Sequence, residues 1–257
     1  MQIEMSHRVV IVTGGCQGIG RGIATRFLGE GADVVVCARH PPQAPVASGG
    51  REAVFIAADV REPDQVEAVV KGAVERFGRI DVLVNNAGGS PPADAATASP
   101  RFSASIINLN LTAPLVSAQR VNTIMQCQSE GGTIVNIASV SGTRPSPGTA
   151  AYGAAKAGLI SLTQSLAVEW APKVRINAVV AGIIRTEKAH LHYGDEAAMQ
   201  RVARTVPLGR MGEPDDVADA CLYLASPWAR YVSGACLTVH GGGETPAFLG
   251  AVAKPLP

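Results

Sequence analysis

The sequence carries almost no net charge and no long apolar run. Its 257 residues include 22 lysines and arginines against 21 aspartates and glutamates, a formal charge of +1. Proteins that bind chiefly nucleic acid or an anionic membrane need a clustered basic surface, so neither partner is expected. The longest uncharged run, 102–119, contains Ser, Asn, Thr, Gln and Pro. A bilayer-spanning helix needs about 20 mostly apolar residues, so no membrane segment is expected.

Cysteine is scarce and unpaired. The five cysteines are odd in number and form no CxxC pair, which argues against a disulfide scaffold and against a thiolate zinc site. His190 and His192 lie two residues apart, but no pattern of Cys or carboxylates supports them as metal ligands. The first residues, MQIEMSHRVVIVTGG, lack the basic-then-apolar order of a signal peptide. We therefore expect a soluble cytoplasmic protein without a metal.

Apolar residues make up 47% of the chain and fall into short runs that alternate with amphipathic segments. Strands are predicted at 8–13, 33–38, 53–58, 80–85, 133–138, 175–180 and 235–240, and helices at 18–31, 63–77, about 102–128 and 150–171. This alternation is typical of a parallel sheet covered on both faces. The Pro-rich stretch 41–47 reads as a surface loop, because the alternation resumes directly after it. We predict an α/β protein with one domain over residues 1–257.

A glycine-rich turn joins the first strand to the first helix. It reads Gly14-Gly15-Cys16-Gln17-Gly18-Ile19-Gly20, so its spacing differs from GxGxxG. Backbone N–H groups and a helix N-terminus at such a turn can bind a pyrophosphate. The alternative is an ordinary tight strand–helix turn. The position of the glycine-rich segment directly after the first strand favours dinucleotide binding.

The end of the second strand bears on which dinucleotide would bind. An acid at this point usually binds the ribose 2′-hydroxyl of NAD, whereas a nearby Arg accommodates the 2′-phosphate of NADP. This chain has Ala38 followed by Arg39. A solvated Arg at a strand end is the alternative. The missing acid and the adjacent Arg favour NADP(H) over NAD(H).

Tyr152 and Lys156 lie four apart at the start of a predicted helix, so their side chains share a face. A free phenol has a pKa of about 10, and a nearby ammonium lowers that pKa. The pair is a plausible proton donor or acceptor, although by itself it is also compatible with a Tyr packed on a Lys stem. Ser139 follows the fifth strand, where open parallel sheets build their sites. Asn110 lies in the preceding predicted helix.

Taken in order, these motifs resemble the short-chain dehydrogenase/reductase family. They are TGGCQGIG, AADV (57–60), NNAG (85–88), the Asn of NLNLT, Ser139, Tyr152-x3-Lys156 and the stretch 175–186. The resemblance covers about residues 8–243. The tail VPLGRMGEPDDVADACLYLAS and the terminal GGG are most similar to the 3-oxoacyl-carrier-protein-reductase-like branch. The resemblance implies a single Rossmann-like, doubly wound domain with seven parallel strands, and commonly a homotetramer.

The resemblance also implies roles for individual residues. Tyr152 would be the acid–base, Lys156 would lower its pKa and bind the nicotinamide ribose, Ser139 would hydrogen-bond the substrate oxygen, and Asn110 would hold a relay water. The implied cofactor contacts are Gly14, Gln17, Gly18, Ile19, Gly20, Arg39, Asp59, Val60, Asn86, Ala87, Gly88, Tyr152, Lys156, Gly182, Ile184 and Thr186. The family's Pro-Gly after the sixth strand is Ala181-Gly182 here, and losing Pro is expected to loosen that turn.

The predicted function is reversible hydride transfer between NADP(H) and a carbonyl or secondary alcohol. A catalytically silent dinucleotide-binding sensor or scaffold is the alternative, since fold does not determine function. Residues 183–212 form a long segment beside the expected cleft, and such segments commonly act as lids. We expect this lid to select the substrate. The apolar tail 244–257 is expected to pack on the body or on a neighbouring subunit.

Overall fold

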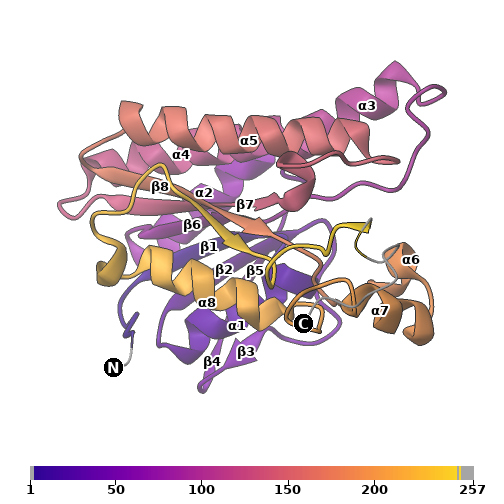
Figure 1. Ribbon diagram of the computed structural model, residues 1–257. Coiled ribbons are helices and arrows are strands. Elements are labelled where there is room, and N and C mark those ends of the chain that lie inside the picture. The colour runs from indigo at the N-terminus through magenta and orange to yellow at the C-terminus, as the bar shows by residue number, and fades with distance from the viewer. Residues whose placement is uncertain (1–2, 248, 250–257) are drawn as a thin grey trace.

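The computed structural model describes residues 3–247 and 249. Its main feature is a seven-stranded parallel sheet in the order β5-β2-β1-β6-β7-β8-β9 (Figure 1). The strands are β1 (Val9–Thr13), β2 (Asp33–Ala38), β5 (Val54–Ala57), β6 (Val82–Asn85), β7 (Gly132–Ser139), β8 (Val174–Ala181) and β9 (Cys236–Val239). All seven predicted strands are confirmed. The order runs outward in both directions from β1 and β6, and ligand crevices of doubly wound sheets form at such a switch point.

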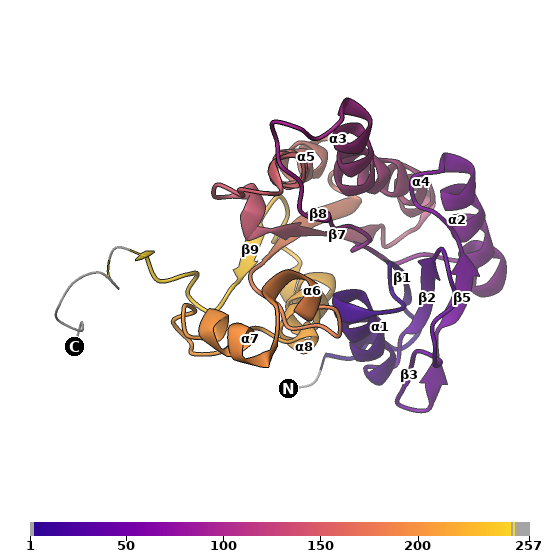
Figure 2. The ribbon, with the colours of Figure 1, turned by 90° about the vertical axis from the view of Figure 1, so that its right-hand side faces the viewer.

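Helices cover both faces of the sheet. On one face lie α1 (Gly18–Gly29) and α8 (Pro214–Ala225), which pack against each other. On the other lie α2 (Pro63–Phe77), α4 (Ala113–Cys127) and α5 (Ala150–Glu169) (Figures 1 and 2). The Rossmann-like, doubly wound architecture is therefore as predicted.

Successive strand residues contribute to opposite layers of the core. In β1, Val10 and Val12 pack with Ile23 and Phe27 of α1, whereas Ile11 packs with the layer under α2 and α4. The same alternation runs through the neighbouring strands because side chains point alternately to the two faces. Both faces are buried, so each strand reads as a continuous apolar run.

The helix predicted over about 102–128 is interrupted. The structure has α3 (Pro100–Ile107), a five-residue π-helical turn (Asn108–Thr112) and then α4. Pro114 lacks an N–H, so it cannot donate to the carbonyl of Asn110 four residues earlier. The helix has a wider turn here, in which the N–H of Ala113 bonds the carbonyl of Asn108, five residues earlier. Turns of this kind occur frequently at functional sites.

Between β2 and β5 the Pro-rich loop leads into a hairpin of β3 (Ala47–Ser48) and β4 (Arg51–Glu52). This hairpin was not predicted. Its turn residues Gly49 and Gly50 both have positive φ, as a two-residue hairpin turn requires. Across the part of the chain described here, no helix has the length and apolar character needed to cross a membrane.

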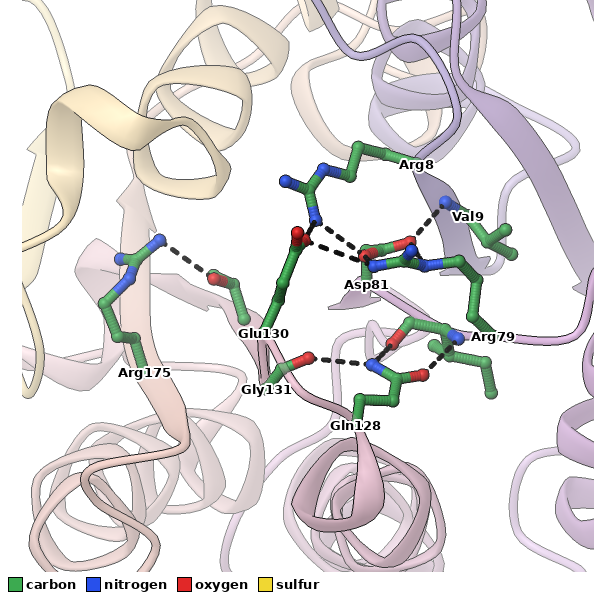
Figure 3. A network of polar contacts seen from close by, with 10 residues as sticks. Arg8, Val9, Arg79, Asp81, Gln128, Glu130, Gly131 and Arg175 are labelled. Carbon is green, nitrogen blue, oxygen red and sulfur yellow. Dashed lines mark hydrogen bonds and ion pairs between the residues drawn. The ribbon is translucent and has the colours of Figure 1, made fainter.

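At the amino ends of the strands, a polar network surrounds Asp81 (Figure 3). Its carboxylate accepts bonds from the guanidinium groups of Arg8 and Arg79 and from the backbone N–H of Val9. Glu130, two residues before β7, pairs with the same two arginines. The network joins the amino ends of β1, β6 and β7, at the end of the sheet opposite the predicted site. It holds these three strands together.

Candidate active site

The glycine-rich turn at the carboxyl end of β1 is held by its neighbours. The N–H of Gly14 bonds the carbonyl of Cys37 at 2.8 Å, which joins the turn to β2. The Thr13 hydroxyl accepts bonds from the N–H groups of Asn86 and Ala87, both at 3.0 Å. The Asn86 amide donates back to the Thr13 carbonyl at 2.9 Å. The turn and the predicted residues Asn86 and Ala87 thus form one rigid unit, in which Thr13 is a participant that the sequence analysis missed.

The start of α1 packs closely against the glycine-rich turn and Asn86. A Cβ on Gly20 would lie 2.3 Å from both the Asn86 Nδ2 and the Gly14 carbonyl oxygen, so only glycine fits there. Gln17, the N-cap, makes no side-chain cap bond. The N–H of Gly18 instead donates 2.8 Å to a carboxylate oxygen of Glu187. A helix N-terminus that already holds a carboxylate has the donors and the field to bind a pyrophosphate, so these residues fit the implied dinucleotide.

The predicted adenosine contacts lie along the ends of β2 and β5. Arg39 is exposed directly after β2, while Asp59 and Val60 are half-buried after β5. The Asp59 carboxylate accepts a 2.9 Å bond from the Nε of Arg61. That arginine lowers the pKa of Asp59, and the charge of Arg39 contributes in the same direction. Two guanidinium groups therefore lie near one carboxylate at this end of the sheet.

Lys156 is buried beneath the site. It lies on α5 one turn after Tyr152, and its Nζ lies 5.6 Å from the centre of the Tyr152 ring. The Nζ donates 2.8 Å to the carbonyl of Ile137 on β7. Burial lowers the pKa of Lys156 to about 8, because the ammonium has lost most of its hydration. The shared face predicted from the spacing of four is present.

Burial raises the pKa of the Tyr152 phenol, since the phenolate is poorly solvated there. Hydrogen bonding to the Ser139 side chain offsets part of that rise, and the nearby Tyr193 adds to it. This direction is opposite to the lowering expected from the Tyr–Lys pair. The reason is that Lys156 is directed to Ile137, and burial has the largest effect on the phenol. Ser139 and Tyr152 are thus brought together as predicted.

Asn110 is fully buried and bonds the loop after β6. Its Oδ1 accepts from the N–H of Gly89 at 2.9 Å, and its Nδ2 donates to the carbonyls of Gly89 and Ile106 at 3.0 and 2.9 Å. A Cβ on Gly88 would lie 2.6 Å from this Oδ1 and 3.3 Å from the Lys156 Nζ. Glycine is therefore required where the loop passes between these two side chains.

A buried polar chain lies behind these residues. The Asn85 amide donates to the Oδ1 of Asn136 at 2.9 Å, the Asn136 amide donates to the Thr163 hydroxyl at 2.9 Å, and Thr163 donates to the Leu159 carbonyl. The bonds tie β6 and β7 to α5, the helix that carries Tyr152. Neither Asn136 nor Thr163 was predicted, since Asn136 stands alone inside an apolar run and Thr163 is one of several polar residues of the helix.

The stretch after β8 lies against the glycine-rich turn. A Cβ on Gly18 would lie 3.4 Å from the Thr186 methyl carbon, while Ile184 is buried and bridges to Gly212. Ala181 continues the strand ladder between β7 and β9, and the N–H of Gly182 bonds the Val239 carbonyl at 2.9 Å. The turn expected to loosen without Pro is thus bonded to β9. Within residues 3–247 and 249, no three His, Cys, Asp or Glu side chains gather as metal ligands would.

Comparison with known proteins agrees with this geometry. The family model described as enoyl-(acyl carrier protein) reductase matches residues 14–244. The chain is 37% identical over 245 residues to the L-rhamnose 1-dehydrogenase (NAD(P)(+)) of Azotobacter vinelandii, covering 91% of this chain and 96% of that protein. It is 35% identical over 246 residues to the 3-oxoacyl-[acyl-carrier-protein] reductase of Synechocystis, covering 93% and 97%.

Among solved structures, the ligand-free aldohexose dehydrogenase of Thermoplasma acidophilum superposes with a TM-score of 0.88. It is 33% identical, and the match covers 98% of each chain. The chain therefore belongs to the short-chain dehydrogenase/reductase family and is an oxidoreductase of the class that uses NAD or NADP.

Proposed function

We propose that this chain is an NADP(H)-dependent reductase of carbonyl compounds, reversible as a secondary-alcohol dehydrogenase, with Tyr152 as its acid–base. The observation that carries the proposal is the cluster of Ser139, Tyr152 and Lys156 beside an anion-binding glycine-rich turn. The nicotinamide, when bound, supplies or accepts the hydride. The chain supplies orientation and the proton.

Tyr152 is suited to proton donation. Because burial raises the pKa of its phenol, the hydroxyl stays protonated near neutral pH. In the direction of reduction, it would give this proton to the oxygen of the substrate carbonyl. Ser139, the last residue of β7, has its side chain beside the phenol and would donate a bond to that same oxygen. The two hydroxyls together would orient the carbonyl and stabilise the charge that develops on it.

Lys156 and Asn110 would then restore the proton. With a pKa of about 8, Lys156 is mostly protonated at pH 7 but gives up a proton far more readily than an exposed lysine. The side-chain amide of Asn110 is hydrogen-bonded to the backbone of Gly89 and Ile106. Its backbone carbonyl, which Pro114 leaves without a helical donor, is the group that would hold a relay water. Lys156 would also bind the nicotinamide ribose.

The preference for NADP(H) rests on Arg39. It lies exposed directly after β2, beside Ala38 and without an acid at the position that would bind a ribose 2′-hydroxyl. Its charge contributes to the lowered pKa of Asp59 at the proposed adenosine end. Arg61 neutralises the Asp59 carboxylate, which would otherwise repel a 2′-phosphate.

A substrate lid would lie over the site at about 183–212. Its two ends are joined, because the N–H of Arg185 bonds the Gly212 carbonyl at 2.7 Å and the N–H of Gly212 bonds the Ile183 carbonyl at 2.9 Å. Between them, α6 (His190–Tyr193) and α7 (Glu196–Ala203) contain no buried residue, and both lie beside the carboxyl ends of the strands (Figure 1). Helices without buried residues, on a segment whose ends are joined, are suited to opening and closing.

We also propose a homotetramer. Val168 on α5 is 81% exposed, Tyr223 on α8 is 36% exposed, and Trp228 and Tyr231 in the segment after α8 are 49% and 101% exposed. These exposed side chains would be covered by neighbouring subunits. Most of the tail predicted to dock lies outside the described residues. Light scattering at micromolar concentration tests the assembly, and a monomer would contradict it.

The direct test is a panel of carbonyl compounds and secondary alcohols assayed with NADPH, NADH and their oxidised forms by nicotinamide absorbance. Turnover of at least one pair, faster with NADPH at subsaturating cofactor, supports the proposal. A protein that binds the dinucleotide but turns over no member of the panel, at any cofactor level, would contradict it.

A further inference from the structure

The carboxylate of Glu187 lies where an anion would bind the glycine-rich turn. Its Oε1 accepts a 2.8 Å hydrogen bond from the backbone N–H of Gly18, the first residue of α1. The two residues are 169 positions apart in the chain, so this contact depends on the tertiary structure. The neighbouring Thr186 lies against the same glycine. Glu187 thus connects the proposed lid to the proposed phosphate site.

Helix α1 supplies no acidic residue of its own at this end. Its N-cap, Gln17, makes no side-chain cap bond, and the first turn contains no acidic residue. An N-cap side chain or an acid in the first turn normally places an acceptor at the positive end of the helix dipole. Here Glu187 supplies that acceptor. A pyrophosphate would need the same N–H and the same field. One N–H cannot serve both anions, and two anions placed side by side repel each other.

We infer that Glu187 competes with the pyrophosphate of the dinucleotide for the N-terminus of α1 and thereby sets the cofactor affinity. This inference rests on the proposed function, because it requires a dinucleotide at the glycine-rich turn. When the pyrophosphate binds, Glu187 leaves Gly18. Glu187 lies three residues before α6, so its release would let the segment that carries Tyr193 near Tyr152 leave this position and close over the bound dinucleotide. Cofactor binding would in this way be coupled to the position of the lid.

The competition acts on the pyrophosphate, which NADPH, NADH and ADP-ribose all contain. Removing the charge at position 187 should therefore tighten all three by a similar factor. Glu187 is exposed, so its contact with Gly18 is screened by solvent, and we expect about three- to tenfold. This pattern differs from that of Arg39, whose loss would affect only the ligand with a 2′-phosphate.

The test measures dissociation constants by calorimetry for Glu187→Gln, Glu187→Ala and wild type with NADPH, NADH and ADP-ribose. Glu196→Gln is the matched control, because Glu196 is an exposed carboxylate of the same segment that pairs with Arg185. Hydrogen exchange without ligand gives a second readout. The Gly18 amide and residues 187–193 should exchange faster in Glu187→Ala than in wild type.

The outcomes separate the inference from the proposed function. Tighter binding of all three ligands by the Glu187 variants, with Glu196→Gln near wild type, supports the inference. Affinities of the Glu187 variants within twofold of wild type, or weaker, overturn it while leaving the function intact. An equal gain in Glu196→Gln also overturns it, because the effect would then be one of general charge. If wild type and variants bind no nicotinamide dinucleotide, the proposed function itself fails.

Discussion

The Nζ of Lys156 donates a 2.8 Å hydrogen bond to the carbonyl of Ile137, which places a buried ammonium between α5 and β7. The bond explains how a cation is tolerated there, since an unpaired buried charge would be far more costly. It also directs the ammonium toward β7, which ends at Ser139, two residues after Ile137. One backbone contact thus helps to hold Lys156 beside the hydroxyls of Ser139 and Tyr152.

Lys156 should make stability depend on pH. Its pKa falls from 10.5 to about 8 in the folded chain, so between these pH values the unfolded chain holds more protons. The cost of the buried charge is fully present below pH 8, and the free energy of unfolding rises with pH across this window. The gain is about 3 kcal/mol at most. Denaturant titrations of wild type and Lys156→Met at several pH values, without cofactor, measure it.

The free energy of unfolding of wild type minus that of Lys156→Met should increase from pH 8 toward pH 10.5. The variant has no proton to lose at this position, so only wild type gains stability there. Lys71→Met, at an exposed lysine of α2, is the control for the loss of a charge. Parallel pH profiles of wild type and Lys156→Met would show that Lys156 titrates normally.

Tyr152→Phe should abolish turnover and leave NADPH binding nearly unchanged, because it removes only the hydroxyl. General acid–base catalysis contributes roughly 10²–10⁴-fold, so kcat should fall by about that factor. Lys156→Ala should impair both binding and turnover. Steady-state kinetics and calorimetry on both variants provide the comparison. A Tyr152→Phe enzyme with near-normal kcat would refute the role of the phenol.

Asn110→Ala should destabilise the fold as well as the site. It leaves the Ile106 carbonyl and both backbone groups of Gly89 without their partner, and losing a buried partner costs about 1–3 kcal/mol. The loop after β6 should then exchange amide hydrogens faster. Urea denaturation and hydrogen exchange check both effects. Asn108→Ala, on the same π-helical turn, is the matched control, and equal destabilisation by the two changes would contradict the special role of Asn110.

Arg39→Ala should weaken NADPH binding and leave NADH nearly unchanged. A charge-assisted hydrogen bond contributes roughly 1.5–3 kcal/mol, or about one to two decades in affinity. Calorimetric titration of both cofactors tests this, and Arg51→Ala, at an exposed arginine of the β3–β4 hairpin, controls for net charge. The NADP(H) preference is wrong if wild type binds NADH as tightly as NADPH.

The lid should select the substrate. Replacing His190, His192 and Tyr193 by Ala should change KM and substrate preference more than NADPH affinity, because these side chains have no fixed chemical task. Without cofactor, residues 187–205 should exchange amide hydrogens rapidly, and NADPH should slow that exchange. Slow exchange that does not respond to cofactor would mean that the segment is a static cover.

The sequence alone determined the parts of this protein that depend on neighbours along the chain. Apolar runs predicted all seven strands, since a strand buried on both faces needs little else. The spacing of four between Tyr152 and Lys156 sufficed to put them on one helix face. The π-helical turn could also have been predicted from Pro114, because the missing N–H is a local property of the sequence. The prediction of one continuous helix over about 102–128 did not take it into account.

Contacts between distant segments were decided only by the tertiary structure. The bond between Gly18 and Glu187, the hold of Asn110 on Gly89 and the link from Asn136 to Thr163 join residues that no local pattern relates. The pKa of Tyr152 belongs to the same group. The sequence predicted a lowered pKa for Tyr152, but in the structure the pKa is raised. Burial of the phenol depends on how the whole chain packs, and it has a larger effect than a lysine four residues away.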